Sequence, residues 1–276
     1  MDSIFYFLEP SFWESTKLVL IFSASIFGVL ILRYFATATL YRSFLKNILG
    51  YAVPQRKNAQ LRKEIYWSVI SSLIFTALAV GTFFLFQRGY TRIYTSFSER
   101  SIPYFIFSIG LVLVLYETYY YWLHRWMHRP SVFRIVHRVH HESIHPTVFT
   151  SFSFHPIEAV LQFIFLPIAI TLIPIHYYAL GIVLLIMTVS AVINHAGVEI
   201  FPGYFAKHPI GKWLIGSTHH DIHHKEFKTN YGLYLSFWDK WMKTESENFE
   251  RQFERNKAGV SQSRSPHRPS TGGLRK

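Results

Sequence analysis

The sequence contains no cysteine and few acidic residues, with 16 aspartates and glutamates against 28 lysines and arginines. The absence of cysteine excludes disulfides, iron–sulfur clusters, thiolate metal ligands and a CxxCH site for haem attachment. No GxGxxG fingerprint for a flavin or nicotinamide cofactor occurs either. Electrons for any redox reaction must therefore come from another protein.

The net charge of +12 has its source in two polar stretches. Basic residues concentrate in the loop 42–63 and in the tail from residue 245 onward. Lysine and arginine gather in this way beside membrane segments on the cytoplasmic side, where they meet anionic lipid headgroups. We therefore expect a membrane surface, and no nucleic acid, as the partner of these charges.

Hydrophobic side chains make up 50% of the chain, and charged ones only 16%. A helix crosses the hydrocarbon core of a bilayer with about 20 apolar residues. Residues 18–41, 65–86 and 101–123 each reach this length, and the longer apolar run 159–193 predicts a helical hairpin, slightly short for two full crossings. We therefore predict an all-α integral membrane protein with four to five transmembrane segments.

Two charged residues interrupt these apolar segments. Arg33 is expected to extend its long side chain towards a membrane interface. Glu117 is either functional or hydrogen-bonded to a neighbouring tyrosine, because an unpaired acid within an apolar segment is costly.

Histidines occur in three clusters, HRWMH, HRVHH and HHDIHH. Residues three and four apart lie on one face of a helix, so each cluster can direct two or three imidazoles to one point. Solvated polar faces are the alternative interpretation, which the repeated HxxHH pattern disfavours. One zinc ion is satisfied by about four ligands, so eight clustered histidines predict two metal ions, whose identity the spacing does not give. The predicted ligands are His124, His128, His137, His140, His141, His220, His223 and His224.

The basic loop also predicts the orientation in the membrane, because cytoplasmic loops carry an excess of lysine and arginine. The first sixteen residues, by contrast, hold only acidic charges. Counting crossings from the loop returns the chain to the cytoplasmic side near His124 and again after the hairpin. All three clusters then lie on that side, in a helical cap formed by residues 129–156 and 197–243. A membrane of the endoplasmic reticulum and a bacterial inner membrane both fit.

With these motifs in this order after apolar segments, residues 116–245 resemble the fatty acid hydroxylase and sterol desaturase superfamily of integral-membrane oxygenases. FHPIE at 154–158 and NHAG at 194–197 extend the likeness. The THHxxHH…NYG run at 218–232, continued by Trp238 and Asp239, is most similar to that of sterol C-5 desaturases.

The resemblance implies a centre of two iron ions that activates dioxygen and removes a hydrogen atom from an unactivated C–H bond. The eight cluster histidines correspond to its ligand positions and carry the catalytic role. His195 and His219 correspond to further metal ligands, and His155 to a supporting histidine. Glu199 occupies the position where some hydroxylases have one more ligand histidine, which leaves that ligand unassigned.

A metal-bound histidine needs a hydrogen-bond partner for its second nitrogen. Five side chains near the clusters are suitable, although each can equally be a solvated loop residue. They are Asp221, Glu142, Glu158, Asp239 and Asn194.

Three classes of function are open. The first is an oxygen-dependent desaturase or hydroxylase of a lipid, either a sterol-like or a fatty-acyl substrate, that receives electrons from a cytochrome b5-like or ferredoxin-like donor. The second is a divalent-metal transporter, which needs ionisable residues near the bilayer midplane. The third is a bis-histidine haem protein, which uses histidine pairs and not HxxHH triplets. Because the clusters follow segment ends on one side, the first class is favoured.

The expected organisation has three regions. Residues 1–100 form membrane anchor segments with the basic loop, residues 101–244 form the catalytic domain, and residues 245–276 form a polar, basic, disordered tail.

Overall fold

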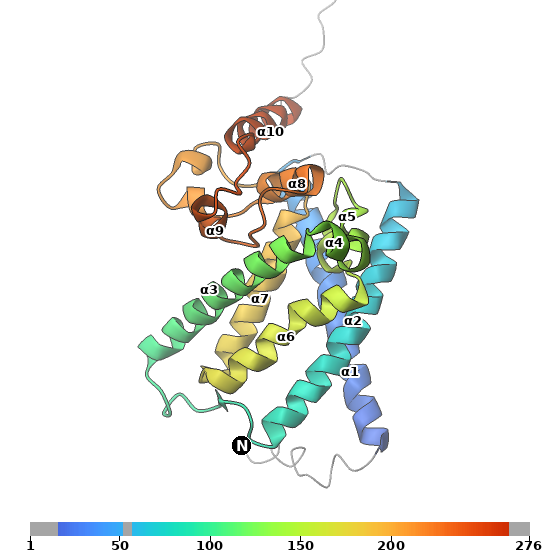
Figure 1. Ribbon diagram of the computed structural model, residues 1–276, viewed down its shortest axis with the longest axis vertical. Coiled ribbons are helices and arrows are strands. Elements are labelled where there is room, and N and C mark those ends of the chain that lie inside the picture. The colour runs from blue at the N-terminus through green and yellow to red at the C-terminus, as the bar shows by residue number, and fades with distance from the viewer. Residues whose placement is uncertain (1–15, 52–56, 265–276) are drawn as a thin grey trace, which may run out of the picture.

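The computed structural model describes residues 16–51 and 57–264. Within these ranges four helices are long and apolar enough to cross a membrane: α1 (Thr16–Ser43), α2 (Asn58–Gln87), α3 (Ile102–Met127) and α7 (Tyr177–Asn194). A shorter apolar helix, α6 (Pro156–Leu172), precedes α7 in the predicted hairpin and has 17 residues. The prediction of an all-α membrane protein is confirmed (Figure 1).

Capping residues set where several of these helices begin. Ser101 accepts a hydrogen bond from the Tyr104 amide at the start of α3. The ring nitrogens of His155 and His176 accept from the Ile157 and Tyr178 amides at the starts of α6 and α7. Such caps satisfy amide groups that have no partner within the first turn of a helix.

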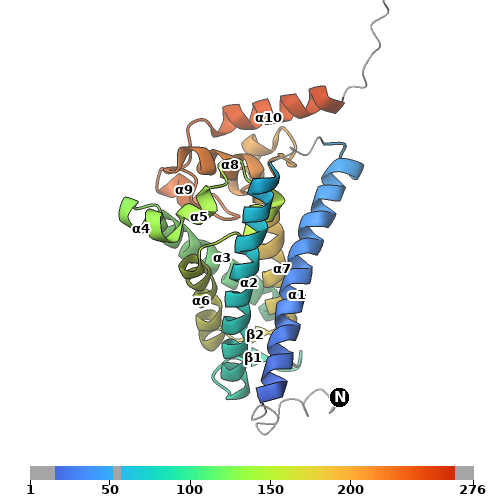
Figure 2. The ribbon, with the colours of Figure 1, turned by 90° about the vertical axis from the view of Figure 1, so that its right-hand side faces the viewer.

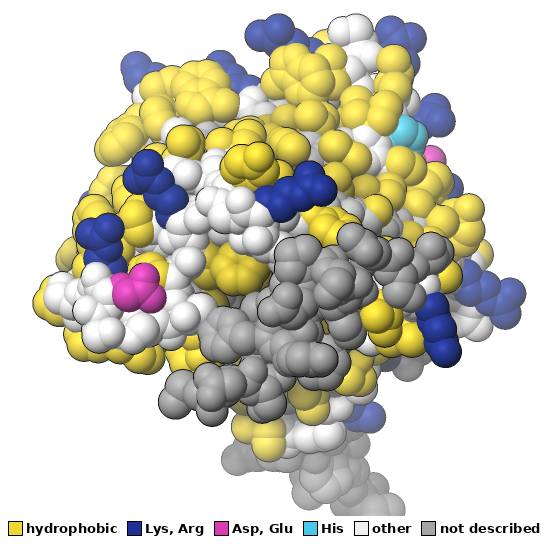
Figure 3. All heavy atoms as spheres, turned by 90° about the horizontal axis from the view of Figure 1, so that it is seen from below, with side chains coloured by type: hydrophobic (Ala, Val, Ile, Leu, Met, Phe, Trp, Pro, Cys, Tyr) yellow, Lys and Arg dark blue, Asp and Glu magenta, His cyan; other side chains and the backbone are white. Residues whose placement is uncertain are grey.

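The outer surface of the helical bundle is apolar. Leu32 on α1 is 70% exposed and Ile106 on α3 is 65% exposed. Figure 3 views the bundle from the end far from the histidines, and hydrophobic side chains cover much of that face, with basic groups scattered among them. A patch of this kind would drive aggregation in water but suits contact with lipid.

The cap lies at the opposite end of the bundle (Figures 1 and 2). Its short helices are α4 (Pro130–Val136), α5 (Arg138–His141), α8 (Ser217–Glu226), α9 (Phe237–Trp241) and α10 (Phe249–Arg264). The last turn of α1 and the first turn of α2 are at this same end (Figure 2). The ends of α1 and α2 that flank the basic loop therefore lie at the same end of the bundle as the histidine clusters, as the counting of crossings predicts.

The far end of the bundle holds a very short parallel pairing, β1 (Ile93–Tyr94) with β2 (Ile175–His176). The chain joins these strands through α3, the cap and α6. The pairing is too short to give the alternating hydrophobic pattern that marks a strand in a sequence.

The helix α10 corrects the expectation of a disordered tail for residues 249–264. Phe249 and Phe253 are buried against Ile222 of α8. Two phenylalanines four residues apart lie on one face of a helix, so a mostly polar segment still has a surface that packs. The remainder of the predicted tail, residues 265–276, lies outside the described residues.

Candidate metal centre

Two helix ends, one short helix pair and the helix α8 bring the histidines together. His124 and the capping residue His128 lie at the end of α3, and His195 directly follows α7. The α4–α5 segment and α8 contribute the remaining members from the cap. Nitrogens of nine histidines thereby form two groups, and within each group the ligand atoms lie within 4.8 Å of one another. The first group is His124, His128, His137, His141 and His223, and the second is His140, His195, His220 and His224.

Neighbouring histidines in both groups approach through their Nε2 atoms. In the first group these atoms are 3.0 Å apart in His124 and His137, and 3.1 Å apart in His141 and His223. In the second group the Nε2 atom of His195 lies 3.0 Å from that of His220 and 3.2 Å from that of His140; the distance from His220 to His224 is 3.1 Å. The imidazoles thus converge edge to edge at two centres.

The Nδ1 atoms show which nitrogens carry hydrogen. Nδ1 of His124 lies 2.8 Å from the Tyr231 carbonyl oxygen, and Nδ1 of His223 lies 2.7 Å from that of Thr229. A carbonyl oxygen only accepts hydrogen bonds, so each Nδ1 is a donor and each neutral ring keeps a lone pair on Nε2. The same holds for His195, whose Nδ1 faces the Ala191 carbonyl oxygen at 2.7 Å.

Lone pairs that face each other at about 3 Å repel, unless a cation lies between them. Imidazole nitrogens bind zinc at about 2.0–2.1 Å, so two ligands at right angles around one ion stand about 3.0 Å apart. The Nε2 separations above match this spacing. The residues present therefore fit a metal ion in each group.

Burial also keeps these rings neutral. It lowers the pKa of His195 and of His223 to about 4. Burial and the neighbouring imidazoles lower the pKa of His220 well below its usual value. Neutral imidazole is the form that binds metals, so no proton has to be displaced at neutral pH.

Among the five side chains predicted to bond the second nitrogen of a ligand histidine, Glu158 does so. Its Oε1 accepts from Nδ1 of His137 at 2.8 Å, and both side chains are fully buried. The other four contact groups other than the ligand histidines. Asp221 pairs with Lys225, and Glu142 pairs with Lys63. Asp239 accepts from the Tyr231 and Gly232 amides, and Asn194 donates to the Leu233 carbonyl oxygen.

The loop 229–235 orients ligands through its backbone. Its carbonyl groups accept from His124 and His223. Glu117 on α3 holds the loop by accepting from the amides of Leu233 and Tyr234, both at 2.9 Å, and of Leu235 at 3.3 Å. The buried acid of α3 is therefore bonded to this backbone, and not to a tyrosine side chain.

Three of the residues singled out in the sequence lie outside both groups. The His219 ring is buried, and its Nε2 lies 3.9 Å from Oε1 of Glu245. His155 caps α6. Glu199 accepts from the Phe201 and Thr218 amides at 3.0 Å and so binds the first turn of α8.

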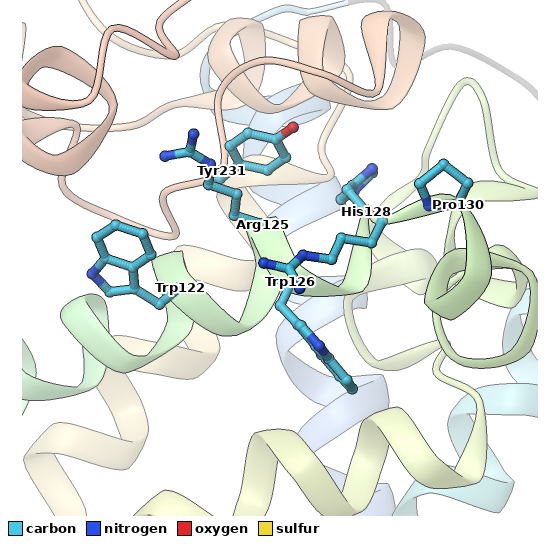
Figure 4. Close-up of a pocket in the computed structure, with 7 residues that line it drawn as sticks. Trp122, Arg125, Trp126, His128, Pro130 and Tyr231 are labelled. Atoms are coloured by element: carbon cyan, nitrogen blue, oxygen red, sulfur yellow. The ribbon is translucent and has the colours of Figure 1, made fainter.

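Two hollows reach the histidines from different sides. An apolar cavity of about 260 Å³ between α1, α2, α3, α6 and α7 ends at His140 and His195. A second pocket of about 600 Å³ reaches His128 of the other group. Figure 4 shows its wall, in which Trp122, Arg125 and Trp126 project from α3 and Tyr231 from the loop 229–235.

Comparisons with known proteins agree with this geometry. The family model for fatty acid hydroxylases matches residues 109–244. Human lathosterol oxidase is 31% identical over 214 residues, which are 75% of this chain and 68% of the relative. A Δ7-sterol 5(6)-desaturase of Aspergillus fumigatus is 28% identical over 84% of this chain and 65% of the relative, and rat lathosterol oxidase is 29% identical over 86% and 80%. No solved structure matches.

The chain belongs to the fatty acid hydroxylase and sterol desaturase superfamily. Its members are oxidoreductases, and a histidine-held di-iron site is a property of the family. The predictions of the family, of the enzyme class and of a histidine-rich membrane protein are confirmed.

Proposed function

We propose that this protein oxidises a C–H bond of a membrane lipid with dioxygen, at two iron ions held by the two histidine groups. The observation that carries the proposal is the apolar cavity, which lies between membrane helices and ends at His140 and His195. A lipid can enter such a cavity without leaving an apolar environment. The nine grouped histidines are the proposed ligands; His219 is no longer included.

The bound metal ions would supply dioxygen activation and the removal of a hydrogen atom. The residues of the chain would bind the substrate and orient the ligands. Stacked rings such as Phe75 and Phe163, with centroids 5.8 Å apart, line the cavity, exclude water and hold an alkyl group by packing. Glu158 and the loop carbonyls fix the orientation of the imidazoles before the substrate arrives.

The proposed substrate is a sterol-like lipid, because the relatives named above are lathosterol oxidases and a Δ7-sterol desaturase. A fatty-acyl lipid is the alternative within the same site. Desaturation and hydroxylation begin with removal of the same hydrogen atom, so the cavity serves either outcome.

We propose the pocket of Figure 4 as the entry side for electrons. Arg125 and Arg129 are exposed at its rim, next to Trp122, which is 46% exposed. An acidic donor of the cytochrome b5-like or ferredoxin-like kind would be attracted to these charges. This end of the molecule would face the cytoplasm, in an endoplasmic reticulum or bacterial inner membrane.

Metal content per chain tests the proposal. We expect about two iron ions per chain in detergent-purified protein produced with adequate iron. We also expect their loss from a variant with His137→Ala, His140→Ala and His141→Ala. The iron-loaded parent should then consume dioxygen with a sterol or fatty-acyl lipid and a reductant. A single metal that the triple substitution leaves in place would contradict the shared site.

A further inference from the structure

One charged side chain stands in the wall of the membrane cavity. Arg33 on α1 lies there beside apolar neighbours such as Leu30 and Leu184. Its guanidinium turns inward and does not extend to an interface as the sequence led us to expect. Nη1 donates to Thr188 Oγ1 at 2.9 Å, and Cζ lies 5.3 Å from the centroid of the Phe152 ring. A charge in such a setting is costly unless something compensates it.

The chain itself compensates this guanidinium only in part. Of its five N–H groups, Nη1–H is bonded to Thr188, while Nε is buried and meets no acceptor among the described residues. Among the described residues, no aspartate or glutamate forms an ion pair with Arg33. The Thr188 hydroxyl donates its own hydrogen to the Leu184 carbonyl oxygen at 2.7 Å. Arg33 therefore keeps donors and a positive charge for a group that enters the cavity.

We propose that Arg33 binds an oxygen acceptor at the polar end of the lipid substrate and thereby determines which carbon reaches the metal centre. This inference rests on the proposed function. A carboxylate fits best, because it neutralises the guanidinium and can accept two parallel hydrogen bonds from it. A hydroxyl group is the weaker ligand of the same kind.

The position of Arg33 also indicates the distance between the bound oxygen acceptor and the metal centre. Its partner Thr188 and the ligand His195 are seven residues apart at the end of α7, which corresponds to about 10 Å of helix rise. The acceptor and the reacting carbon are therefore separated by several carbon–carbon bonds. A 3-hydroxysterol bound in this way would present carbons far from C3, and not C5, which is only two bonds from C3. Regioselectivity should thus differ from that of a 5(6)-desaturase.

Binding of matched probes tests the role of Arg33 without requiring turnover. The iron-loaded chain in bilayer discs is titrated with tritiated stearate and octadecane, and with cholest-7-en-3-ol and cholest-7-ene. Each pair differs only in the oxygen group. We expect the parent to bind stearate about 10- to 100-fold more tightly than octadecane, corrected for partitioning into the bilayer. The sterol pair should show a smaller preference of the same sign.

Two arginine variants complete the experiment. Arg33→Gln should remove the preference for the oxygenated probe and leave the affinity for octadecane unchanged. Arg42→Gln is the matched control, because Arg42 is exposed on the same helix and should keep the preference. Equal affinity for both members of each pair in the parent, or a preference that survives Arg33→Gln, would overturn the inference.

The parent protein offers a second measurement if Arg33→Gln fails to fold. Fatty acids of three chain lengths are oxidised, and the position of the change is mapped in each product. Anchoring at Arg33 keeps this position constant when counted from the carboxyl carbon; a position constant from the methyl end contradicts it. If no lipid is oxidised, the proposed function fails, whereas the probe affinities of the parent still decide whether Arg33 binds an oxygen acceptor.

Discussion

The cap and the membrane half of this molecule use polar groups in opposite ways. In the cap, three imidazoles meet fixed acceptors through Nδ1: those of His124 and His223 face the Tyr231 and Thr229 carbonyl groups, and that of His137 faces the Glu158 carboxylate. In the membrane half, Arg33 stands in an apolar cavity with donors unused. The cap is thus organised around positions that it holds in advance, whereas the membrane half leaves hydrogen-bonding capacity for a ligand. Changes in the cap should affect metal binding first, and changes in the cavity should affect selectivity.

The largest effect is expected from His223→Ala in the cap. Its Nε2 lies 3.1 Å from that of His141 in the first group, so the substitution removes a proposed ligand. We expect loss of bound iron and of turnover, measured by metal analysis and dioxygen uptake. His219→Ala is the matched control from the same helix and should retain both. Equal iron content in the two variants would contradict the assignment of His223, and not His219, as a metal ligand.

The second-largest effect is expected from substitution of Glu117, the acid that holds the loop 229–235. Glu117→Ala leaves three amide groups of that loop without their acceptor. Buried unpaired groups of this kind cost roughly 2–5 kcal/mol together. We expect a matching fall in the free energy of unfolding in mixed micelles, with weaker iron retention. Glu99→Ala, which changes an exposed acid at the far end of the bundle, should leave both quantities unchanged.

A smaller effect is expected from Glu158→Gln, which keeps an acceptor for His137 but removes its charge. Loss of a partner behind a metal ligand typically lowers metal affinity about 10- to 100-fold, and the retained amide oxygen should bring the effect to the lower end. Competition with a chelator measures it. Glu142→Gln, which affects a carboxylate paired with exposed Lys63, is expected to match the parent.

The smallest effect concerns the rim of the pocket in Figure 4. Arg129→Gln should slow reduction by an acidic donor protein a few-fold at low ionic strength, and less at high ionic strength, because salt screens exposed charges. Stopped-flow reduction measures the rate, and iron content should not change. Arg134→Gln, on the neighbouring helix α4 but outside the pocket, serves as the control. A rate that does not depend on ionic strength would argue against docking at this rim.

The sequence predicted what depends on local spacing. Apolar runs predicted the membrane helices. The i,i+4 spacing pairs His137 with His141 and His220 with His224, whereas His140 and His223 belong to the opposite group in each case. The distinction between His219 and His220 follows from the same geometry, since adjacent residues on a helix point about 100° apart. The family resemblance was needed for His195, because a lone histidine after an apolar run gives no such pattern.

The sequence could not predict what depends on contacts between distant segments. Glu117 and Leu233 are 116 positions apart, and four histidines of the two groups direct Nδ1 to backbone carbonyl groups, which no residue type marks. The loop 229–235 shows the same limit. Its left-handed residue is Asn230, with φ of 59°, while Gly232 is needed because a side chain there would collide with Ile215 and the Leu235 carbonyl oxygen.

The two histidine groups differ in number, with five imidazoles in the first and four in the second. Two metal ions held by them would therefore have different numbers of protein ligands. The second group is also the one at which the membrane cavity ends, through His140 and His195. The ion with fewer protein ligands would therefore be the one nearest to a lipid bound in this cavity.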